Sequence, residues 1–539
     1  MESFLMPIVK QPERKIFTYQ TRIRADAIQA KFLEDTATHL SQVERALFAD
    51  YSRGKNILKI KSEYLSRYGI TARQFNAIRI NLEGKLQSIK AIQVDNLRVI
   101  THKINKISKV IARIEKNKSH IKNAHHVLHQ KKRSLAIQQH KQGALSSKIA
   151  SGKVSLCFGG KRLFNRQYHL KKNGYSDHAG WKEDWHQSRC QQFFLLGSKD
   201  EAMGNQSGVA TLNPDSSINL RIRVPDHLST VYGKYVTLEN ITLNHGKADI
   251  LAALAENSLR KSLASKAEMA KKGDLFKSHG VAINYRFVQD DKSWRLFIIL
   301  EKPTVTSKTD QRRGAIGVDI NVSHLSVTEI DHKGNYRRAF DIPLSTYGKS
   351  RSQSLAVIGD AVSRLAAYAL ETGKPIVIEA LDFSEKKKAL NTRNKKKCRQ
   401  LSAFAYASII QHIRAKTFNL GIGLAAVNPA YSSLIGRVKF GRIYTTLSVH
   451  QAAALVIARR LFRYSERLPH CWDHIPDNTG GHLTLPVLVK IPRRHIWHTW
   501  ATVMKNLQKA LAAQYRMFKQ RAGPSFDKWF DDADQQIPF

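Results

Sequence analysis

The stretch that decides the fold begins Ala315-Ile-Gly-Val-Asp-Ile and continues through His324-Leu-Ser-Val-Thr-Glu-Ile to Tyr336-Arg-Arg-Ala-Phe-Asp-Ile. These runs are rich in apolar and β-branched residues, and short polar segments separate them, so they predict three consecutive strands. A helical pattern over 352–372 ends at a glycine, and the apolar strand Pro375-Ile-Val-Ile-Glu follows it. The region therefore starts as a sheet and then alternates helix with strand.

A second helix over 402–420, the strand Ile422-Gly-Leu-Ala-Ala-Val and a third helix over 450–462 complete the series. The order βββαβαβα resembles that of the ribonuclease H fold, a mixed sheet covered by helices. A last amphipathic helix, over 498–520, carries apolar residues on one face. We expect it to dock onto this domain.

Upstream, the periodicity changes twice. After a first edge strand, Phe17-Thr-Tyr-Gln-Thr-Arg-Ile-Arg, the pattern is helical to about residue 150. One apolar stripe recurs at helical spacing, and it consists of Leu97, Ile100, Ile104, Ile107, Ile111 and Ile114. An antiparallel partner helix is expected to carry Ile121, Val127, Leu128 and Leu135. From about 205 the pattern alternates, and it predicts strands over 217–224, 235–238, 281–288 and 293–300, the last two forming a hairpin.

Composition indicates a polyanionic partner. The 539 residues, long enough for several domains, include 88 Lys and Arg against 43 Asp and Glu, a formal charge of +45, while 42% are hydrophobic. A globular chain so basic is expected to bind nucleic acid. The amino terminus lacks the pattern of a signal peptide and no run is long enough to cross a membrane, so we expect a soluble cytoplasmic protein. The cysteines 157, 190, 398 and 471 are far apart, which predicts reduced thiols and no zinc ribbon.

Two basic clusters are candidate phosphate contacts. The first is a stripe at helical spacing, and its members are Lys103, Lys106, Lys109, Arg113 and Lys116. The second follows the strand that ends at Glu379, and its members are Lys386, Lys387, Lys388, Arg393, Lys395, Lys396, Lys397 and Arg399. For each cluster, a solvated surface is the alternative to binding a nucleic-acid backbone.

A pair of acids indicates metal-dependent phosphodiester chemistry. Asp319 lies in the first strand among apolar residues, and Glu379 ends the strand Ile376-Val-Ile-Glu. In such a fold, carboxylates that converge on the sheet hold two divalent ions about 4 Å apart. A third acid is expected at the start of the last helix, but 386–465 contains no Asp or Glu, and His450 stands there. Asp382 could replace it, His450 could itself be a ligand, or the site could be too weak to cut; the sequence leaves these open.

Four segments resemble the motifs of a known family. Gly317-Val-Asp-Ile, Ile376-Val-Ile-Glu-Ala-Leu-Asp-Phe and Val427-Asn-Pro-Ala-Tyr-Ser-Ser, with the helix that begins Gln451-Ala-Ala-Ala, are similar to the RuvC-like motifs of TnpB, the OrfB protein of bacterial insertion sequences. Type V CRISPR effectors derive from that family. The resemblance covers about 205–465 and implies an RNA-guided, DNA-targeting protein with a RuvC-like nuclease domain.

The resemblance implies a multidomain α+β layout. It consists of a first wedge strand (1–25), a helical recognition domain (26–204), a β-barrel wedge domain (205–305), a linker (306–313) and a ribonuclease H-like α/β nuclease domain (314–539). The implied partners are a guide RNA and double-stranded target DNA, and the implied cofactor is Mg²⁺ or Mn²⁺. We expect a monomer or weak dimer in the bacterial cytoplasm, associated with the nucleoid. The chain departs from the family in lacking the four-cysteine zinc ribbon, so no zinc is expected, and in carrying His450 where members carry Asp.

Three functions remain open at this point. The first is RNA-guided DNA cleavage by metal-dependent hydrolysis that uses Asp319 and Glu379. The second is guided DNA binding without efficient cutting, as a repressor or recruiter, and the missing third acid favours it. The third is an unguided nuclease or transposase of the ribonuclease H superfamily, which the basic helical region disfavours.

Overall fold

The computed structural model describes residues 14–116, 123–262, 280–380, 406–468, 474–476, 482–484 and 496–522. The chain divides into two compact units, one over Arg14–Lys302 and the other over Pro303–Phe539 together with Met1–Glu13. Helices dominate the first part of the chain and several sheets follow, so the protein is a mixed α+β protein.

The helices of the first unit begin directly after its first strand. They are α1 (Ala27–Ser52), α2 (Lys61–Tyr68), α3 (Ala72–Lys116), α4 (Ala124–Ala150), α5 (Lys161–Arg166), α6 (His178–Cys190), α7 (Ser229–Tyr232) and α8 (Lys247–Ser262). Asp26 starts α1 with a capping box, because its side chain accepts from the Gln29 backbone N–H while the Gln29 side chain accepts in return.

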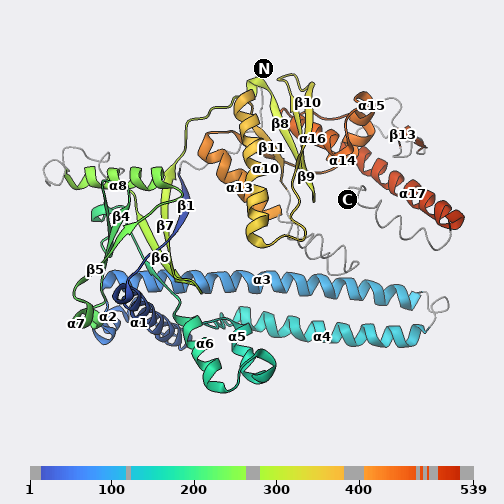
Figure 1. Ribbon diagram of the computed structural model, residues 1–539. Helices are drawn as coiled ribbons and strands as arrows, with labels where there is room; N and C mark the ends of the chain where they lie inside the picture. The colour runs from blue at the N-terminus through green and yellow to red at the C-terminus, as the bar shows by residue number, and fades with distance from the viewer. Residues whose placement is uncertain are drawn as a thin grey trace. The chain divides into compact units, whose positions relative to one another are not determined.

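Helices α3 and α4 form a long antiparallel pair, as the apolar stripe predicts (Figure 1). Ile111 and Ile114 of α3 are buried against Ala124 and Leu128 of α4, and Val127 and Leu135 pack on the same cluster. The predicted partner residue Ile121 lies outside the described residues. The stripe prediction is thus confirmed where it is described.

The strands of the first unit form two sheets. Their bounds are β1 (Arg14–Arg22), β2 (Gln192–Leu195), β3 (Gly208–Leu212), β4 (Ile218–Arg223), β5 (Tyr235–Ile241), β6 (Ile283–Gln289) and β7 (Trp294–Pro303). One sheet has the order β1-β7-β6-β2 and the other the order β3-β4-β5. The predicted hairpin is confirmed as β6 and β7, which pair from Ile283 with Leu300 to Gln289 with Trp294.

The predicted barrel is corrected to two open sheets that share a core. In the described residues no ladder joins β2 to β3 or β1 to β5, so the two sheets do not close into one barrel. What joins them is Asn205, whose buried side-chain amide donates to the carbonyls of Leu195 and Ile283 and accepts from the backbone of Gly208. This side chain thus bridges the two sheets at a place where no strand pairing joins them in the described residues. Strand β2, which the sequence analysis left within the helical region, belongs to this core.

The second unit contains one five-stranded sheet. Its strands are β8 (Ala315–Ile320), β9 (His324–Ile330), β10 (Tyr336–Pro343), β11 (Ile376–Glu379) and β12 (Leu424–Val427), in the order β10-β9-β8-β11-β12. Strands β8, β9 and β10 are antiparallel, whereas β11 runs parallel to both β8 and β12. A small pair of strands, β13 (His474–Pro476) and β14 (His482–Thr484), lies further along the chain.

The helices that flank this sheet follow the predicted order. They are α10 (Arg351–Thr372), α13 (Tyr406–Leu420), α14 (Ser432–Ile435), α15 (Gly441–Ile443), α16 (Val449–Leu461) and α17 (Ile496–Ala522), and a π-helical turn spans Gly436–Phe440. Glycines with left-handed backbones, Gly373 and Gly421, follow α10 and α13 where the sequence predicts the ends. The predicted element order is confirmed; the first residues predicted for α13 lie outside the described residues.

Each face of the sheet has its own core. Ile316, Val318, Ile376 and Ile378 pack on the side of α10 and α13. Ala315 and Val377 alternate with them and pack on the side of α16, where Trp500, Val503 and Leu507 of α17 are also buried. The docking predicted for the last helix is therefore confirmed.

Gly317 lets α16 lie directly on β8. A Cβ at this position would collide with the carbonyl oxygen of Ala454 and the backbone of Ala458. The facing side of the helix carries the small residues Ala454 and Ala458, which are both fully buried. The position of the first turn of α16 over the sheet is thus set by close backbone packing.

Candidate functional site

Asp319 and Glu379 lie near the carboxyl ends of two neighbouring strands, on the same face of the sheet. Val318 of β8 pairs with Ile378 of β11 in parallel register, and each acid is the next residue of its strand. Because side chains alternate along a strand and Val318 and Ile378 face α10 and α13, both acids face α16. Neighbouring strands lie about 4.8 Å apart. The sequence prediction that these acids lie close together is consistent with this register.

His450 binds Asp319 directly. Its Nδ1 lies 3.0 Å from Asp319 Oδ2, and because a carboxylate only accepts, Nδ1 carries the proton. The same oxygen accepts from the Asn321 side-chain amide at 3.1 Å. The Asp319 side chain is 11% exposed and that of His450 is 23% exposed, so the contact is largely shielded from water.

The start of α16 is what aims His450 at the sheet. Ser448 is the N-cap, and it forms a capping box with Gln451 at 3.1 and 3.2 Å. His450 is the second residue of the helix, so Asp319 lies beside the helix N-terminus. A carboxylate is stabilised there by the helix dipole, independently of any metal.

A second histidine adjoins the pair. The ring of His324, on β9, meets the ring of His450 edge-on at 5.3 Å between centroids. Burial lowers the pKa of His324, and the neighbouring His450 adds to this effect, while the carboxylates of Asp341 and Asp319 oppose it. The immediate surroundings of Asp319 are thus imidazoles and an amide.

Asp341 is a carboxylate that the sequence analysis missed. Asp319 pairs with Ser326 across β8 and β9, and Ser326 pairs with Asp341 across β9 and β10, so the three lie in one row on one face. Ser326 donates to Asp341 Oδ1 at 2.7 Å, and Gln451 of α16 donates to Oδ2 at 3.2 Å. Only the pairing register places Asp341 in this row; the signal available in the sequence is its position within the third predicted strand.

Glu379 is engaged by a different set of protein groups. Ser432 donates to Glu379 Oε1 at 2.6 Å from the first turn of α14. Arg460 of α16 binds the carbonyls of Asn428 and Ala430 in the loop after β12. Burial lowers the pKa of Arg460 and the Glu379 carboxylate opposes this, so a guanidinium lies within electrostatic reach of the acid. The sequence analysis assigned no role to Ser432 or Arg460.

The described residues do not assemble a divalent-metal centre. Carboxylate oxygens on adjacent strands are the ligand type that Mg²⁺ and Mn²⁺ prefer. One oxygen of Asp319 already accepts two hydrogen bonds, however, and one of Glu379 accepts from Ser432. Among the described residues, no three His, Cys, Asp or Glu side chains converge in a way that could hold a metal ion. Asp382, a candidate third acid, lies outside the described residues, and no step is assigned to a metal.

The stripe on α3 is a continuous exposed surface. Lys103, Lys106, Lys109, Arg113 and Lys116 are all exposed, on the opposite side from buried Ile111 and Ile114. Within the described ranges none of the five forms an ion pair, whereas nearby Glu115 binds Lys132 of α4. The predicted basic loop, with Lys386, Lys387, Lys388, Arg393, Lys395, Lys396, Lys397 and Arg399, lies outside the described residues.

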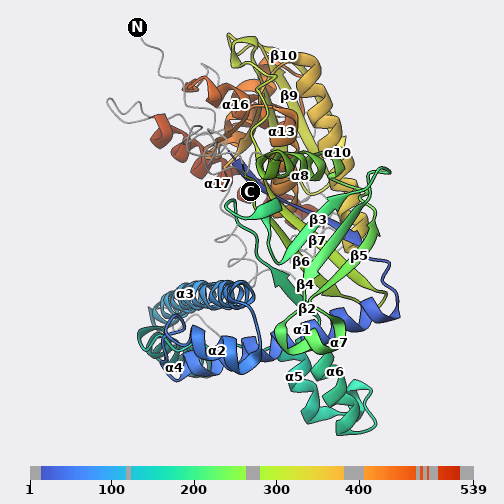
Figure 2. The same cartoon turned by 90° about the vertical axis from the view of Figure 1, so that its left-hand side faces the viewer.

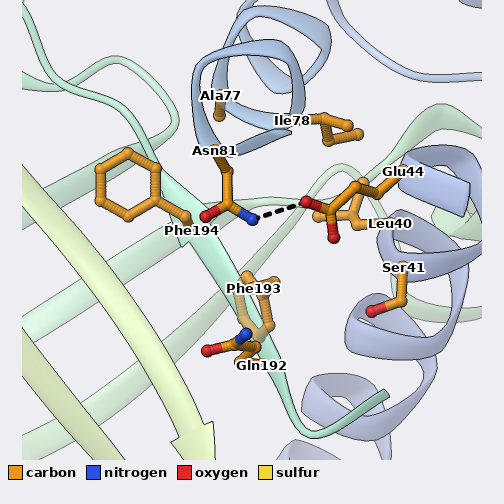
Figure 3. Close-up of a pocket in the computed structure, with 9 residues that line it drawn as sticks. All are labelled: Leu40, Ser41, Glu44, Ala77, Ile78, Asn81, Gln192, Phe193 and Phe194. Carbon is orange, nitrogen blue, oxygen red and sulfur yellow. Dashed lines mark hydrogen bonds between the residues drawn. The ribbon is translucent and has the colours of Figure 1, made fainter. Parts of the chain in front are cut away.

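A cavity in the first unit belongs to the core and not to this site. It measures about 20 Å³, which is room for about one water molecule. Glu44 lines it and accepts from Asn81 at 2.8 Å (Figure 3). The same carboxylate also accepts from Lys85 at 2.7 Å. The one acid that lines the cavity is therefore already paired with groups of α3.

Comparisons with known proteins give a weak likeness. No protein-family model and no curated protein matches the chain. Among solved structures, a CRISPR-Cas12f ternary complex matches with 12% identity and a TM-score of 0.19, over 82% of this chain and 98% of that one. A Cas12i1 R-loop complex after target DNA cleavage matches with 9% identity and a TM-score of 0.18, over 76% of this chain and 50% of that one. A Cas12i1–crRNA binary complex matches with 9% identity and a TM-score of 0.17, over 86% and 57%.

The structural neighbours are thus Cas12f and Cas12i1 complexes, and at these TM-scores the likeness decides neither fold nor function. None of the helices in the described part of the chain is long and apolar enough to span a lipid bilayer.

Proposed function

We propose that this chain is an RNA-guided DNA-targeting protein of the TnpB type, with a ribonuclease H-like second unit. One observation carries the proposal: the four segments that resemble the family motifs converge on one face of one sheet. Asp319 and Glu379 end adjacent strands there, Ser432 reaches Glu379, and α16 brings His450 to Asp319. The contact between His450 and Asp319 joins residues 131 positions apart in the sequence, and the contact between Ser432 and Glu379 joins residues 53 positions apart.

The arrangement of the site favours guided DNA binding over DNA cleavage. Protein groups already hold both carboxylates: His450 and Asn321 bind Asp319, and Ser432 with nearby Arg460 engages Glu379. A metal ion would have to compete with these donors for the same two carboxylates, and it would find no third carboxylate on α16. We therefore infer a nuclease domain whose cutting is attenuated and whose binding is intact.

Cleavage is the second candidate, and one specific observation favours it. Asp319 and Glu379 lie level on parallel strands and face the same side, the placement that two hard-oxygen ligands need. Asp341 extends the row by one more carboxylate. If cutting occurs, Asp319→Asn and Glu379→Gln are each expected to abolish it.

The stripe on α3 supports the nucleic-acid part of the proposal. Its members span about 20 Å along the helix, the length of about six phosphates of one DNA strand. Five exposed cations without ion pairs in the described residues gain from binding phosphates, because the counterions of the nucleic acid are released.

The test begins with the RNA that copurifies with the full chain. A discrete species is expected, and sequencing it supplies a guide whose matching duplex DNA is then offered to the complex with Mg²⁺ or Mn²⁺. Bound and intact DNA supports the attenuated form, and bound and cut DNA supports the second candidate. Absence of any bound RNA, with sequence-independent DNA cutting, would favour the unguided nuclease and overturn the proposal.

A further inference from the structure

The segment 153–176 carries an unusual charge pattern. It contains no Asp or Glu and six cations, Lys153, Lys161, Arg162, Arg166, Lys171 and Lys172. Within the described residues none of the six forms an ion pair, and all but Arg166 are exposed. The segment includes α5, and with α6 it projects from the sheets of its own unit (Figures 1 and 2). The segment thus packs on the core through Val154, Leu156 and Phe158, and it carries a net positive charge.

Two aromatic rings lie exposed among these cations. Tyr168 is 65% exposed and Phe164 is 37% exposed, and their rings meet edge-on at 6.3 Å between centroids. A single exposed aromatic ring is common on protein surfaces and needs no explanation. Two adjacent exposed rings within one positively charged segment are less ordinary, because leaving both in water is costly. Their exposure indicates that something else covers them.

The rings are backed by a rigid support. Phe164 packs on Trp185 at 5.4 Å, and Trp185 stacks on Trp181 at 5.8 Å, with planes only 14° apart. Trp181 is buried and donates its indole N–H to the carbonyl of Leu163 at 2.9 Å, which ties α6 to the start of α5. Arg189 covers Trp185 at 5.3 Å. Such a support holds the rings of Phe164 and Tyr168 in place, so fixing them on binding costs little further conformational entropy.

We propose that Tyr168 and Phe164 form a stacking site for unpaired nucleotides of an RNA strand whose phosphates contact the surrounding cations. This inference rests on the proposed function, which supplies the RNA. Aromatic faces stack on any exposed base, and interleaved Lys and Arg neutralise the backbone. A double helix keeps its bases stacked internally and cannot use the rings. An apolar protein groove would cover the rings but leave six cations without partners.

The experiment uses the full chain stripped of copurified RNA, with a labelled single-stranded RNA free of self-complementarity and the same sequence as a duplex. Tyr168→Ala is expected to weaken single-strand binding about 5- to 150-fold, the effect of losing one stacked base. Tyr168→Phe keeps the ring and is expected to bind as the parent does. Because Tyr168 is exposed, neither change should affect folding, and Phe164→Leu gives an independent second variant.

Salt dependence separates stacking from charge. Tyr168→Ala should leave the slope of log affinity against log salt unchanged. The double variant Lys171→Gln, Lys172→Gln should make this slope less steep by about 1.4, because each lost phosphate contact accounts for about 0.7 on a single strand. Equal single-strand binding by the parent, Tyr168→Ala and Phe164→Leu would overturn the inference, as would an equal loss on the duplex. If the parent itself binds no RNA, the proposed function fails, and that result is distinct from a parent that binds and variants that match it.

Discussion

Replacing His450 by Asp tests whether the site can be converted into a metal centre. The change puts a carboxylate in the first turn of α16, where His450 Nδ1 now lies 3.0 Å from Asp319 Oδ2. It removes a donor to Asp319 and adds a like charge beside it. The variant should therefore be less stable than the parent without metal, and a divalent ion should relieve the repulsion.

The magnitude follows from the geometry of the contact. Two carboxylates about 4 Å apart repel by about 4 kcal/mol at an effective dielectric constant of about 20, and by about 1 kcal/mol in bulk water. The side chains here are 11% and 23% exposed, which places the pair toward the first value. The N-terminus of α16 offsets about 0.3–1 kcal/mol of this, because it favours an acid in its first turn. The expected net loss is about 3 kcal/mol of unfolding free energy.

The assay is thermal and urea unfolding of the full chain with and without MnCl₂. His450→Asp should regain stability as Mn²⁺ rises, by about 2.7 kcal/mol once the ion reaches about a hundred times its dissociation constant. His450→Asn is the matched control, because it has the size of Asp without the charge, and it should show no such gain. An equal Mn²⁺ response in the parent, His450→Asn and His450→Asp would refute the reasoning, since it would show that position 450 does not control metal binding.

Three further expectations concern other parts of the molecule. Glu466 is 5% exposed and binds both Lys439 and Arg459, so Glu466→Gln should cost about 3–5 kcal/mol in urea unfolding; a loss below about 1 kcal/mol would contradict this. The hydrogen bonds from Arg22 hold the pKa of Asp290 below its usual range, so the ionised Asp290 should stabilise the fold above about pH 4, and the melting temperature should fall as the pH is lowered further. Asp290→Asn should make the melting temperature fall less over that range, and the same pH profile in the variant and the parent would contradict this. Changing four exposed cations of the α3 stripe together to Glu, at Lys103, Lys106, Arg113 and Lys116, should abolish RNA or duplex binding in a filter assay while the circular dichroism spectrum stays the same. Glutamine at the same positions should weaken binding less, and unaffected binding in the Glu variant would show that the stripe is only a solvated face.

The sheet of the second unit is predictable because its strands are local and its ends are marked. Three alternating runs with short turns, and helices that end at Gly373 and Gly421, require no long-range information. The two sheets of the first unit are less predictable. Whether they close into a barrel depends on which edges pair, and that pairing joins segments distant in sequence, as the hydrogen bond from Asn205 to Ile283 also does.

The residues of the candidate site also fall into some that the sequence predicts and some that it does not. Asp319 and Glu379 are recognisable because an acid in an apolar strand is unusual wherever the strand lies. Asp341 and Arg460 are not, because an acid in a half-exposed strand and an arginine on a helix are ordinary. Their roles arise from strand register and from the position of α16, which brings Gln451 to Asp341 and places Arg460 near Glu379.

If the proposed function holds, the difference between cutting and binding without cutting depends on a local change at residue 450. Gly317 and the alanines of α16 set the helix against β8 through backbone contacts that do not depend on the identity of residue 450. A histidine in that position binds Asp319 without moving the helix, whereas an acid there would repel Asp319 unless a cation or a proton lay between the two carboxyl groups. On this reasoning, His450→Asp should leave the packing of α16 on β8 unchanged and alter only what Asp319 binds.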